Sequence, residues 1–501
     1  MESLSRRAFL RGTCATAAGL TLADLVGPGP RPAPVEAEGL ANFPAPEAMD
    51  RVIARALGRG GDYADLFVER RLMTTARLVD GAVQSYEHGV LQGGGVRTLQ
   101  GEQTGYAYAE TLDTDALAAV AATAAEIATH SGGVQPVAVE PVEFARHIRA
   151  QREIAEATVA ERTAVLERVD QAARAVDPSI QQVSVQYFDS DQTFAIATSE
   201  GRYAEDRLPM IYLRVTVNAV RGDRRAEGSF RTAQRAGMEF FDGGLAAEAG
   251  RRAAEQAVRM LEAAPAPGGE LPVVIAAGGG VMFHEAVGHG LEADGVLRDA
   301  SVFAGRVGER VASELVTLYD DATPPGKRGS FNVDDEALPA SRTLLIERGR
   351  LVGYLQDWRT AHRMGVKRTA NGRRQSLRHP PLVRMTNTNV APGEHDPEAI
   401  IKETPRGIYA VDFGGGEVDT VSGQFTFGLR EAYLIEDGRV TTPIKGANLV
   451  GSGIQVLERI DRVGNDFGSW PGTCGKGGQW VPVTSGCPTL RIARITVGGT
   501  A

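Results

Sequence analysis

Residues 278–294 read GGGVMFHEAVGHGLEAD, and this stretch decides how the rest of the chain is interpreted. His284 and Glu285 are followed, after three further residues, by His289, whereas the common zinc-protease signature has only two residues in that gap. Zinc requires imidazoles that converge on one point. Five steps along an ideal α-helix rotate a side chain by roughly 140°, so the two histidines converge only if the helix contains one wider turn with an i→i+5 hydrogen bond. Gly288 lets the backbone form such a turn at low cost.

We interpret this stretch as a metal site in which Glu285 takes a proton from a water molecule on the metal. The alternative is a helix with ordinary polar residues, but burying these side chains in an apolar, glycine-flanked run is costly without a function. A third ligand is required, and the residues leave three candidates open: Glu292, His379 and Cys474. A disulfide between Cys474 and Cys487 is a competing interpretation of the thiol.

The composition bounds the class of protein. A chain of 501 residues is too long for one hydrophobic core, which favours two or three domains. The net charge of −9 argues against nucleic acid as a partner. The body of the chain contains no apolar run of 18 residues, so we expect no integral membrane segment after removal of a signal.

The N-terminal sequence SRRAFLRGTCATAAGLTLADLVG, residues 5–27, resembles a twin-arginine export signal, with Arg6 and Arg7 ahead of an apolar, alanine-rich run. Small residues at 35–37 offer a cleavage site. We therefore interpret residues 1–45 as a signal and flexible leader, and expect the mature protein in the periplasm or another extracytoplasmic space. The protein would be cytoplasmic if the signal is not functional.

Hydrophobic periodicity and turn residues predict an α+β fold. Two N-terminal units, residues 46–150 and 151–267, each show a helix, several strands and a second helix. In the second unit, Thr158 and Glu161 have the spacing of a helix capping box. A mostly β domain rich in glycine follows at residues 268–501.

Several segments then point to one family. HEAVGHGLEAD (284–294), NGRRQSLRHPPLVRMTNTNV (371–390) and the C-terminal GTCGKGGQW…TVGGTA (472–501) look like the TldD/PmbA family, on its TldD side, and GGDYADLFVERR (60–71) resembles it too. The resemblance covers roughly residues 46–501. It implies a zinc peptidase, because the TldD branch carries the five-step histidine pattern that the PmbA branch lacks. It also implies Cys474 as the third ligand, which argues against the disulfide to Cys487. Family members form dimers of identical chains or of one catalytic and one non-catalytic chain, mostly in the cytoplasm.

The resulting hypothesis is a peptidase with one Zn²⁺ held by His284, His289 and Cys474, which hydrolyses unfolded or extended peptides with Glu285 as general base. Two rival hypotheses are a non-catalytic binding subunit of a family heterodimer and a zinc amidase or esterase acting on a non-peptide substrate.

Auxiliary roles are open for two further segments. His379, Arg378 and Arg384 either assist the site or form ordinary ion pairs with acidic residues. Gly414, Gly415 and Gly416 either expose a strand edge for a peptide or form a glycine-rich turn or bulge.

Overall fold

The computed structural model describes residues 43–128 and 133–499. The predicted export signal and its cleavage site lie outside these residues. No helix in the described ranges is both long and apolar enough to cross a membrane.

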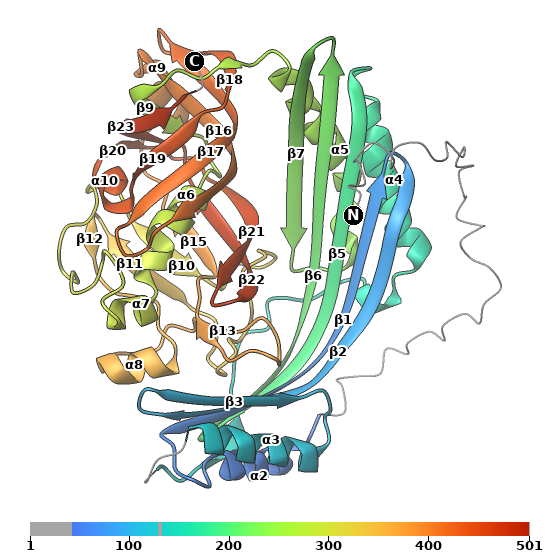
Figure 1. The fold of residues 1–501 in the computed structure, drawn as a ribbon, viewed down its shortest axis with the longest axis vertical. Helices are drawn as coiled ribbons and strands as arrows, with labels where there is room; N and C mark the ends of the chain where they lie inside the picture. Colours follow the sequence, from blue (N-terminus) through green and yellow to red (C-terminus); the bar gives the residue numbers. More distant parts are fainter. Residues whose placement is uncertain (1–42, 129–132, 500–501) are drawn as a thin grey trace, which may run out of the picture. The chain divides into compact units, whose positions relative to one another are not determined.

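A curved seven-stranded sheet dominates the N-terminal half (Figure 1). Its strands run in the order β3-β2-β1-β5-β6-β4, and β7 pairs with the other end of β6. Asp80 and Gly81 form the tight β1–β2 turn, both with positive φ (51° and 76°), as an Asp-Gly hairpin turn requires. The strands are β1 (Tyr63–Val79), β2 (Ala82–Gln100), β3 (Gln103–Ala109), β4 (Val137–Pro141), β5 (Ile180–Thr198), β6 (Glu200–Arg221) and β7 (Arg224–Gln234).

The two predicted N-terminal units share this sheet. Strand β1 pairs with β5 from Asp65 opposite Thr198 to Val79 opposite Ser184, so hydrogen bonds join the segments that the sequence analysis placed in separate units. The order of elements is helix, strands, helix in each segment, but neither segment has a sheet of its own. Periodicity within a strand does not reveal such a pairing between distant strands.

Four helices cover one face of the sheet, two at each end (Figure 1). They are α2 (Pro46–Ala56), α3 (Thr114–Ile127), α4 (Val159–Arg174) and α5 (Leu245–Met260). Val185 and Tyr187 of β5 pack toward α4 and α5, whereas Phe194 and Ile196 on the other face pack against the C-terminal half. The predicted capping box of Thr158 and Glu161 is confirmed at the start of α4.

The C-terminal half contains two larger sheets and a short hairpin, β13–β14. In one sheet β16-β9-β23-β19-β17 close into a ring, because β16 also pairs with β17. In the other, the order is β12-β11-β10-β15-β22-β21. The strands are β8 (Ala264–Pro265), β9 (Gly269–Ile275), β10 (Leu318–Asp321), β11 (Arg342–Glu347), β12 (Arg350–Leu351), β13 (Gly372–Arg373), β14 (Leu382–Val383), β15 (Asn387–Val390), β16 (Arg406–Val418), β17 (Gln424–Glu436), β18 (Arg439–Lys445), β19 (Asn448–Ser452), β20 (Ile460–Val463), β21 (Gly468–Lys476), β22 (Gln479–Cys487) and β23 (Leu490–Gly498).

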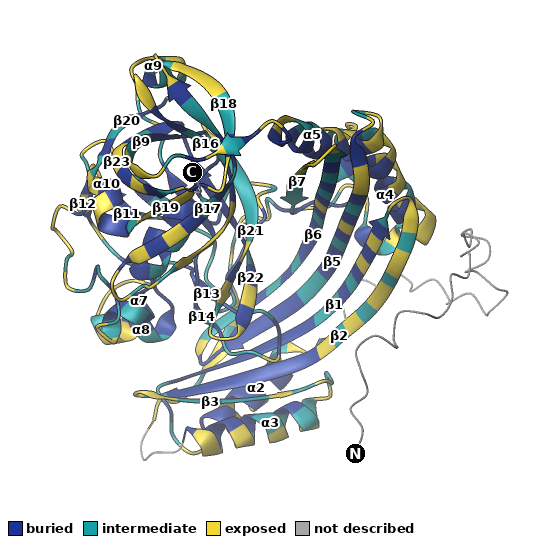
Figure 2. Cartoon of the chain, turned by 45° about the horizontal axis from the view of Figure 1, so that its top comes forward, coloured by how far each residue is buried: buried dark blue, intermediate teal, exposed yellow. Residues whose placement is uncertain are grey.

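Short helices connect these sheets. The largest buried core contains residues from both sheets and from these helices (Figure 2). The helices are α6 (Val281–Phe283), α7 (Ala293–Leu297), α8 (Trp358–Met364), α9 (Pro397–Lys402) and α10 (Gly453–Glu458). The chain is thus a mixed α and β protein whose C-terminal half is mostly β.

The capping box gives a testable contribution to stability. Thr158→Ala removes the side-chain acceptor for the backbone N–H of Glu161 and should lower the free energy of unfolding by about 1 kcal/mol. The matched control is Glu167→Ala, an exposed residue of the same helix, which should change stability by less than about 0.5 kcal/mol. Urea midpoints of the two variants check this, and equal midpoints would contradict it.

Candidate metal centre

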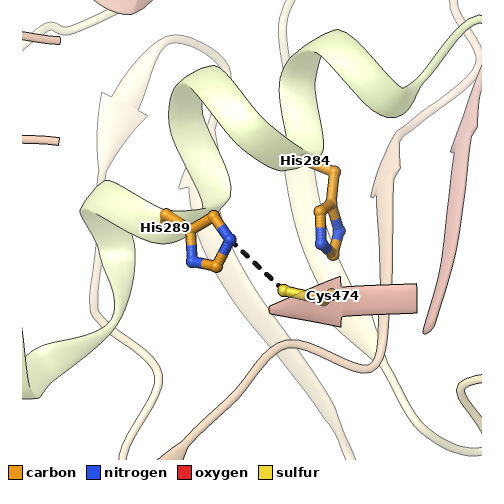
Figure 3. A group of neighbouring side chains, drawn as sticks. All are labelled: His284, His289 and Cys474. Atoms are coloured by element: carbon orange, nitrogen blue, oxygen red, sulfur yellow. Dashed lines mark hydrogen bonds between the residues drawn. The ribbon is translucent and has the colours of Figure 1, made fainter. Parts of the chain in front are cut away.

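The wide helical turn predicted from the histidine spacing is confirmed. Helix α6 continues into a π-helical turn, η3 (His284–Gly288), and then into a 3₁₀ turn, η4 (His289–Leu291). The imidazoles of His284 and His289 consequently lie on the same side, with ring centroids 5.8 Å apart (Figure 3).

Gly288 is required for a different reason from the one expected. Its φ of −57° and ψ of −47° are ordinary helical values, so the backbone does not use glycine's conformational freedom there. A Cβ atom at this position would instead lie 2.1 Å from Sδ of the buried Met385. The glycine is needed because Met385 packs directly against the wide turn.

The thiol of Cys474 reaches the two imidazoles from strand β21 (Figure 3). Its Sγ lies 3.2 Å from Nε2 of His289, and one ligand atom from each of the three residues lies within 4.8 Å of the others. Nε2 of His284 is buried and has no hydrogen-bond partner in the described part of the chain. A buried nitrogen of this kind is satisfied if it binds a metal ion.

The electrostatics of the three residues favour a cation among them. Burial alone would raise the pKa of the Cys474 thiol, but the neighbouring His284 and His289 imidazoles outweigh burial and lower this pKa to about 5. Burial likewise opposes protonation of His289, yet the Glu292 carboxylate and Cys474 raise its pKa well above the usual range. The site therefore holds a thiolate and stabilises positive charge beside it.

A hydroxyl and a buried carboxylate orient His284. Its Nδ1 lies 3.1 Å from Oγ1 of Thr388, whose hydroxyl donates to Oδ1 of Asp320 at 3.1 Å. The Thr388 oxygen is then left to accept from Nδ1–H, which directs the Nε2 lone pair toward Cys474. Partners of this kind fix the tautomer and the ring orientation of a metal ligand.

A second carboxylate orients His289. Oε2 of Glu292 lies 2.9 Å from Nδ1 of His289, and Nζ of Lys476 donates to the same oxygen at 3.0 Å. Lys476 also donates to Asp294 at 2.6 Å. Glu292, one of the candidate ligands, therefore lies behind His289 and outside the cluster of three ligand atoms. Burial would raise its pKa, but Lys476 and His289 lower it to about 2.

Glu285 lies at the open side of the cluster. Its Oε2 is 3.5 Å from Nε2 of His289, and its side chain is 29% exposed. Together with His289, Lys476 and Gly416 it lines a cavity of about 520 Å³. A carboxylate placed here can reach both the cluster and a molecule in the cavity.

The other predicted residues lie outside the cluster. His379 contacts Ser376 through Nδ1 at 3.0 Å. Arg378 forms an ion pair with Glu110 at 2.6 Å, the ordinary pairing considered above. Arg384 is fully buried and donates to the carbonyl oxygen of Cys474, so it supports the strand that carries the thiol.

Cys487 is a separate buried thiol. No disulfide joins it to Cys474, and both cysteines are free. Burial raises the pKa of the Cys487 thiol to about 12, which keeps it protonated and unreactive.

The three predicted glycines lie on β16, beside the cavity. The register of β16 against β17 shifts between Phe413 and Gly415, where Gly415 has a φ of 143°. A Cβ at Gly416 would lie 2.1 Å from the ring of Phe427. The segment is therefore a β-bulge, but Gly416 also lines the cavity of Glu285.

Three family sequence models match the chain along most of its length: PmbA/TldA metallopeptidase domain 1 at residues 64–128, the central domain at 152–261 and the C-terminal domain at 268–499. A metalloprotease TldD homolog of Haemophilus influenzae is 40% identical over 454 residues, covering 88% of this chain and 94% of the relative. The chain belongs to the PmbA/TldA metallopeptidase family. The resemblance inferred from the sequence motifs is thereby confirmed at the level of the family.

Another relative matches at lower sequence identity, and two solved structures share the fold. A metalloprotease of Methanothermobacter thermautotrophicus is 33% identical over 443 residues, covering 88% of this chain and 96% of the relative. TldE from Thermococcus kodakarensis superposes with a TM-score of 0.73 at 19% identity, covering 90% of this chain and all of the other. A Thermotoga maritima structure described as a putative modulator of a DNA gyrase gives a TM-score of 0.76 at 22% identity, covering 90% and 99%.

Sequence reasoning did not find Asp320, Thr388 or Lys476. Thr388 lies in the quoted run MTNTN and Lys476 in CGK, so both were within motifs whose other residues drew attention. Asp320 lies far from every motif and is linked to the site only because β10 pairs with β15.

Thr388 provides a sharp test of this arrangement. Thr388→Val keeps the side-chain shape but removes the acceptor for His284, and should weaken metal binding by about 10- to 100-fold. Thr386→Val is the matched control, because Thr386 donates to the same Asp320 at 2.6 Å and forms no hydrogen bond with His284 within the described residues. Competition with a chelator measures both affinities, and equal losses would refute a specific role of Thr388.

The packing of Gly288 can be tested by a compensating pair. Gly288→Ala should lower stability by about 1–3 kcal/mol, because its Cβ overlaps Met385. Met385→Ala added to Gly288→Ala removes the overlapping atoms, so the double variant should lose less stability than the sum of the two single variants. Thermal unfolding of wild type, the two single variants and the double variant gives the coupling free energy between positions 288 and 385. Stability losses that simply add would contradict the contact between Gly288 and Met385.

Proposed function

We propose that the chain is a zinc-dependent peptidase of the catalytic, TldD-like branch, which hydrolyses unfolded or extended peptides. The observation that carries the proposal is the convergence of His284, His289 and Cys474, with Nε2 of His284 buried and unpartnered in the described residues. The name metalloprotease borne by the H. influenzae relative supports a metal and peptide hydrolysis.

The donor set fits zinc. Two imidazoles and one thiolate are typical zinc ligands, and three protein ligands leave one coordination position open, as in catalytic sites. The ion would polarise the scissile carbonyl and supply a more acidic water molecule. His284, His289 and Cys474 would hold one Zn²⁺ in each chain.

Glu285 would act as the general base. Its partly exposed carboxylate lines the open cavity and lies beside His289, so it can accept a proton from the attacking water and then donate it to the leaving amine. Arg384 would act indirectly, since it holds the backbone of Cys474. His379 contacts Ser376 and receives no role in the reaction.

The edge of β16 would bind the substrate. Strand β16 pairs with β9 only from Ile408 to Ala410, so the same edge farther along the strand is not paired with β9. Gly416 and Val418 from this farther part line the cavity together with Glu285. An extended peptide that adds to this edge would be recognised through its backbone, which suits unfolded substrates of varied sequence.

The chain would act as a dimer, either with itself or with a related non-catalytic chain, as the shared fold with TldE supports.

The twin-arginine motif supports export before action, and therefore an extracytoplasmic substrate. Fractionation of cells into periplasm and cytoplasm tests the location, since Arg6→Lys combined with Arg7→Lys should retain an exported protein in the cytoplasm.

Glu285→Gln is the central test of the catalytic mechanism. We expect the wild-type protein to contain about one zinc per chain and to cleave an unstructured protein such as casein. Glu285→Gln should retain the zinc and lose activity by at least about 100-fold, because the base contributes on the order of 10²–10⁴ in rate. Cys474→Ser should lose the zinc itself.

Glu398→Gln, an exposed residue of α9, is the matched control and should behave as wild type. Peptide cleavage is followed by mass spectrometry and zinc by elemental analysis. Stoichiometric zinc with hydrolysis only of small esters or amides would favour the non-peptide alternative. Zinc-free protein without activity would favour a binding subunit.

A further inference from the structure

A second cavity lies on the other face of the hairpin that carries Cys474. Side chains alternate along β21, so Cys474 points to the histidines while its neighbour Thr473 lines this cavity of about 290 Å³. The opposite wall comes from the curved sheet, including Phe188 and Met210, and Trp480 of β22 lies at the rim with 60% exposure. The long strands of the sheet and the β21–β22 hairpin are both visible in Figure 1.

Five arginines line this cavity, and only two of them form ion pairs. Arg71 pairs with Glu69 at 2.8 Å and Arg374 with Asp65 at 2.9 Å. The other three, all more than nine-tenths buried, have no carboxylate within ion-pair distance in the described residues: Arg235, Arg328 and Arg373.

Neutral groups hold two of these three guanidiniums. Arg328 donates to the carbonyl oxygen of Gly472 at 2.9 Å and to Oγ1 of Thr473 at 3.0 Å. Arg373 donates to the carbonyl oxygens of Met385 and Pro482, the latter at 2.8 Å. Both guanidiniums are therefore fixed in position, but their charge is not neutralised by these contacts.

Arg235 is the least satisfied of the three. Its Nε donates to the carbonyl oxygen of Ser330 at 3.0 Å, and its two Nη groups have no acceptor within the described residues. Burial, and then the charges of Arg373 and Arg328, lower the pKa of Arg235 well below its usual range. A buried guanidinium in this state is costly unless an anion accompanies it.

Two carboxylates also line the cavity, but backbone groups already bind them. Asp334 accepts from the backbone N–H of Glu336 and Leu338, and Asp335 accepts from the backbone N–H of Arg374 at 2.6 Å. The three unpaired guanidiniums outnumber these two carboxyls, and burial raises the pKa of both, to about 7 for Asp334. The lining is therefore positively charged overall and favours an anion.

We infer that this cavity binds a small organic monocarboxylate with an apolar body, its carboxylate on Arg235 and its apolar part against Phe188 and Met210. A planar carboxylate matches the paired N–H donors of a guanidinium. The volume suits a molecule of about one amino-acid residue in size, and two sources share this chemistry: the C-terminal end of a peptide and a free carboxylic acid. The site does not depend on the proposed peptidase activity.

Binding of N-acetyl-L-leucine, compared with the uncharged N-acetyl-L-leucinamide, tests the inference. Isothermal titration calorimetry on the full chain should detect the acid and not the amide. Arg235→Met should weaken binding of the acid by about 10- to 100-fold, since it removes a charge-assisted hydrogen bond. Arg235→Lys, which keeps the charge, should retain part of the affinity. Arg225→Gln, at an exposed position of β7, the strand that ends just before Arg235, should leave the affinity unchanged.

Stability separates a ligand site from a structural arginine. Arg235→Met removes an uncompensated buried charge, so its thermal midpoint without ligand should equal or exceed that of wild type. A lower midpoint together with unchanged acid binding would overturn the inference. So would equal binding of acid and amide, binding of inorganic phosphate without binding of the acid, or binding of the acid that persists in Arg235→Met, since the acid would then bind without Arg235.

A peptide pair then identifies the source of the carboxylate. A leucine-terminated tripeptide with a free C-terminus is compared with its C-terminal amide in Glu285→Gln, so that cleavage does not interfere. Tighter binding of the free peptide than of N-acetyl-L-leucine assigns the cavity to peptide ends, and the reverse order assigns it to free acids. Failure of casein cleavage leaves both measurements interpretable, because neither requires turnover.

Discussion

The site depends on one geometric constraint, the wide turn that brings two imidazoles five residues apart to the same side of a helix. An unbroken α-helix would separate His284 and His289 by roughly 140° around its axis. The turn is held by close packing: Met385 occupies the space beside Gly288, and a Cβ at Gly453 would lie 2.3 Å from the carbonyl oxygen of Ala286. Glycines at these contacts let neighbouring segments approach the turn closely enough to keep it in place.

The strand that supplies the thiolate also fixes one of the histidines. Cys474 and Lys476 are two residues apart on β21 and therefore point to the same face. Lys476 holds Glu292, and Glu292 holds Nδ1 of His289. A displacement of β21 would thus move the thiolate and release the histidine together, which makes this strand the element on which the geometry of the cluster most depends.

The sequence predicted the local parts of this arrangement better than the distant ones. The spacing of His284, Glu285 and His289 was enough to predict the wide turn, because both ligands and the backbone between them are contiguous. The residues alone left Cys474 in competition with His379 and Glu292, and only the family resemblance ranked it first. Asp320 and the joining of β1 to β5 depend on pairings between strands far apart in the chain, which a pattern within one segment does not encode. The sequence indicated Gly288 for its backbone freedom, which the structure does not use. The actual reason for glycine is crowding by Met385, a tertiary contact that the local sequence does not encode.

Hairpin β21–β22 separates the candidate metal centre from the arginine-lined cavity, two buried regions that favour ligands of opposite charge. On one face, a thiolate and two imidazoles favour binding of a cation. On the other face, three guanidiniums without ion-pair partners favour binding of an anion. The two regions meet in the backbone, because Arg384 donates to the carbonyl oxygen of Cys474 while Arg328 donates to the side chain of Thr473 next to it. Neutral hydrogen bonds of this kind hold the hairpin in position without cancelling either charge. The hairpin is therefore fixed by the protein itself, and each face keeps the uncompensated charge with which a ligand of the opposite sign would interact.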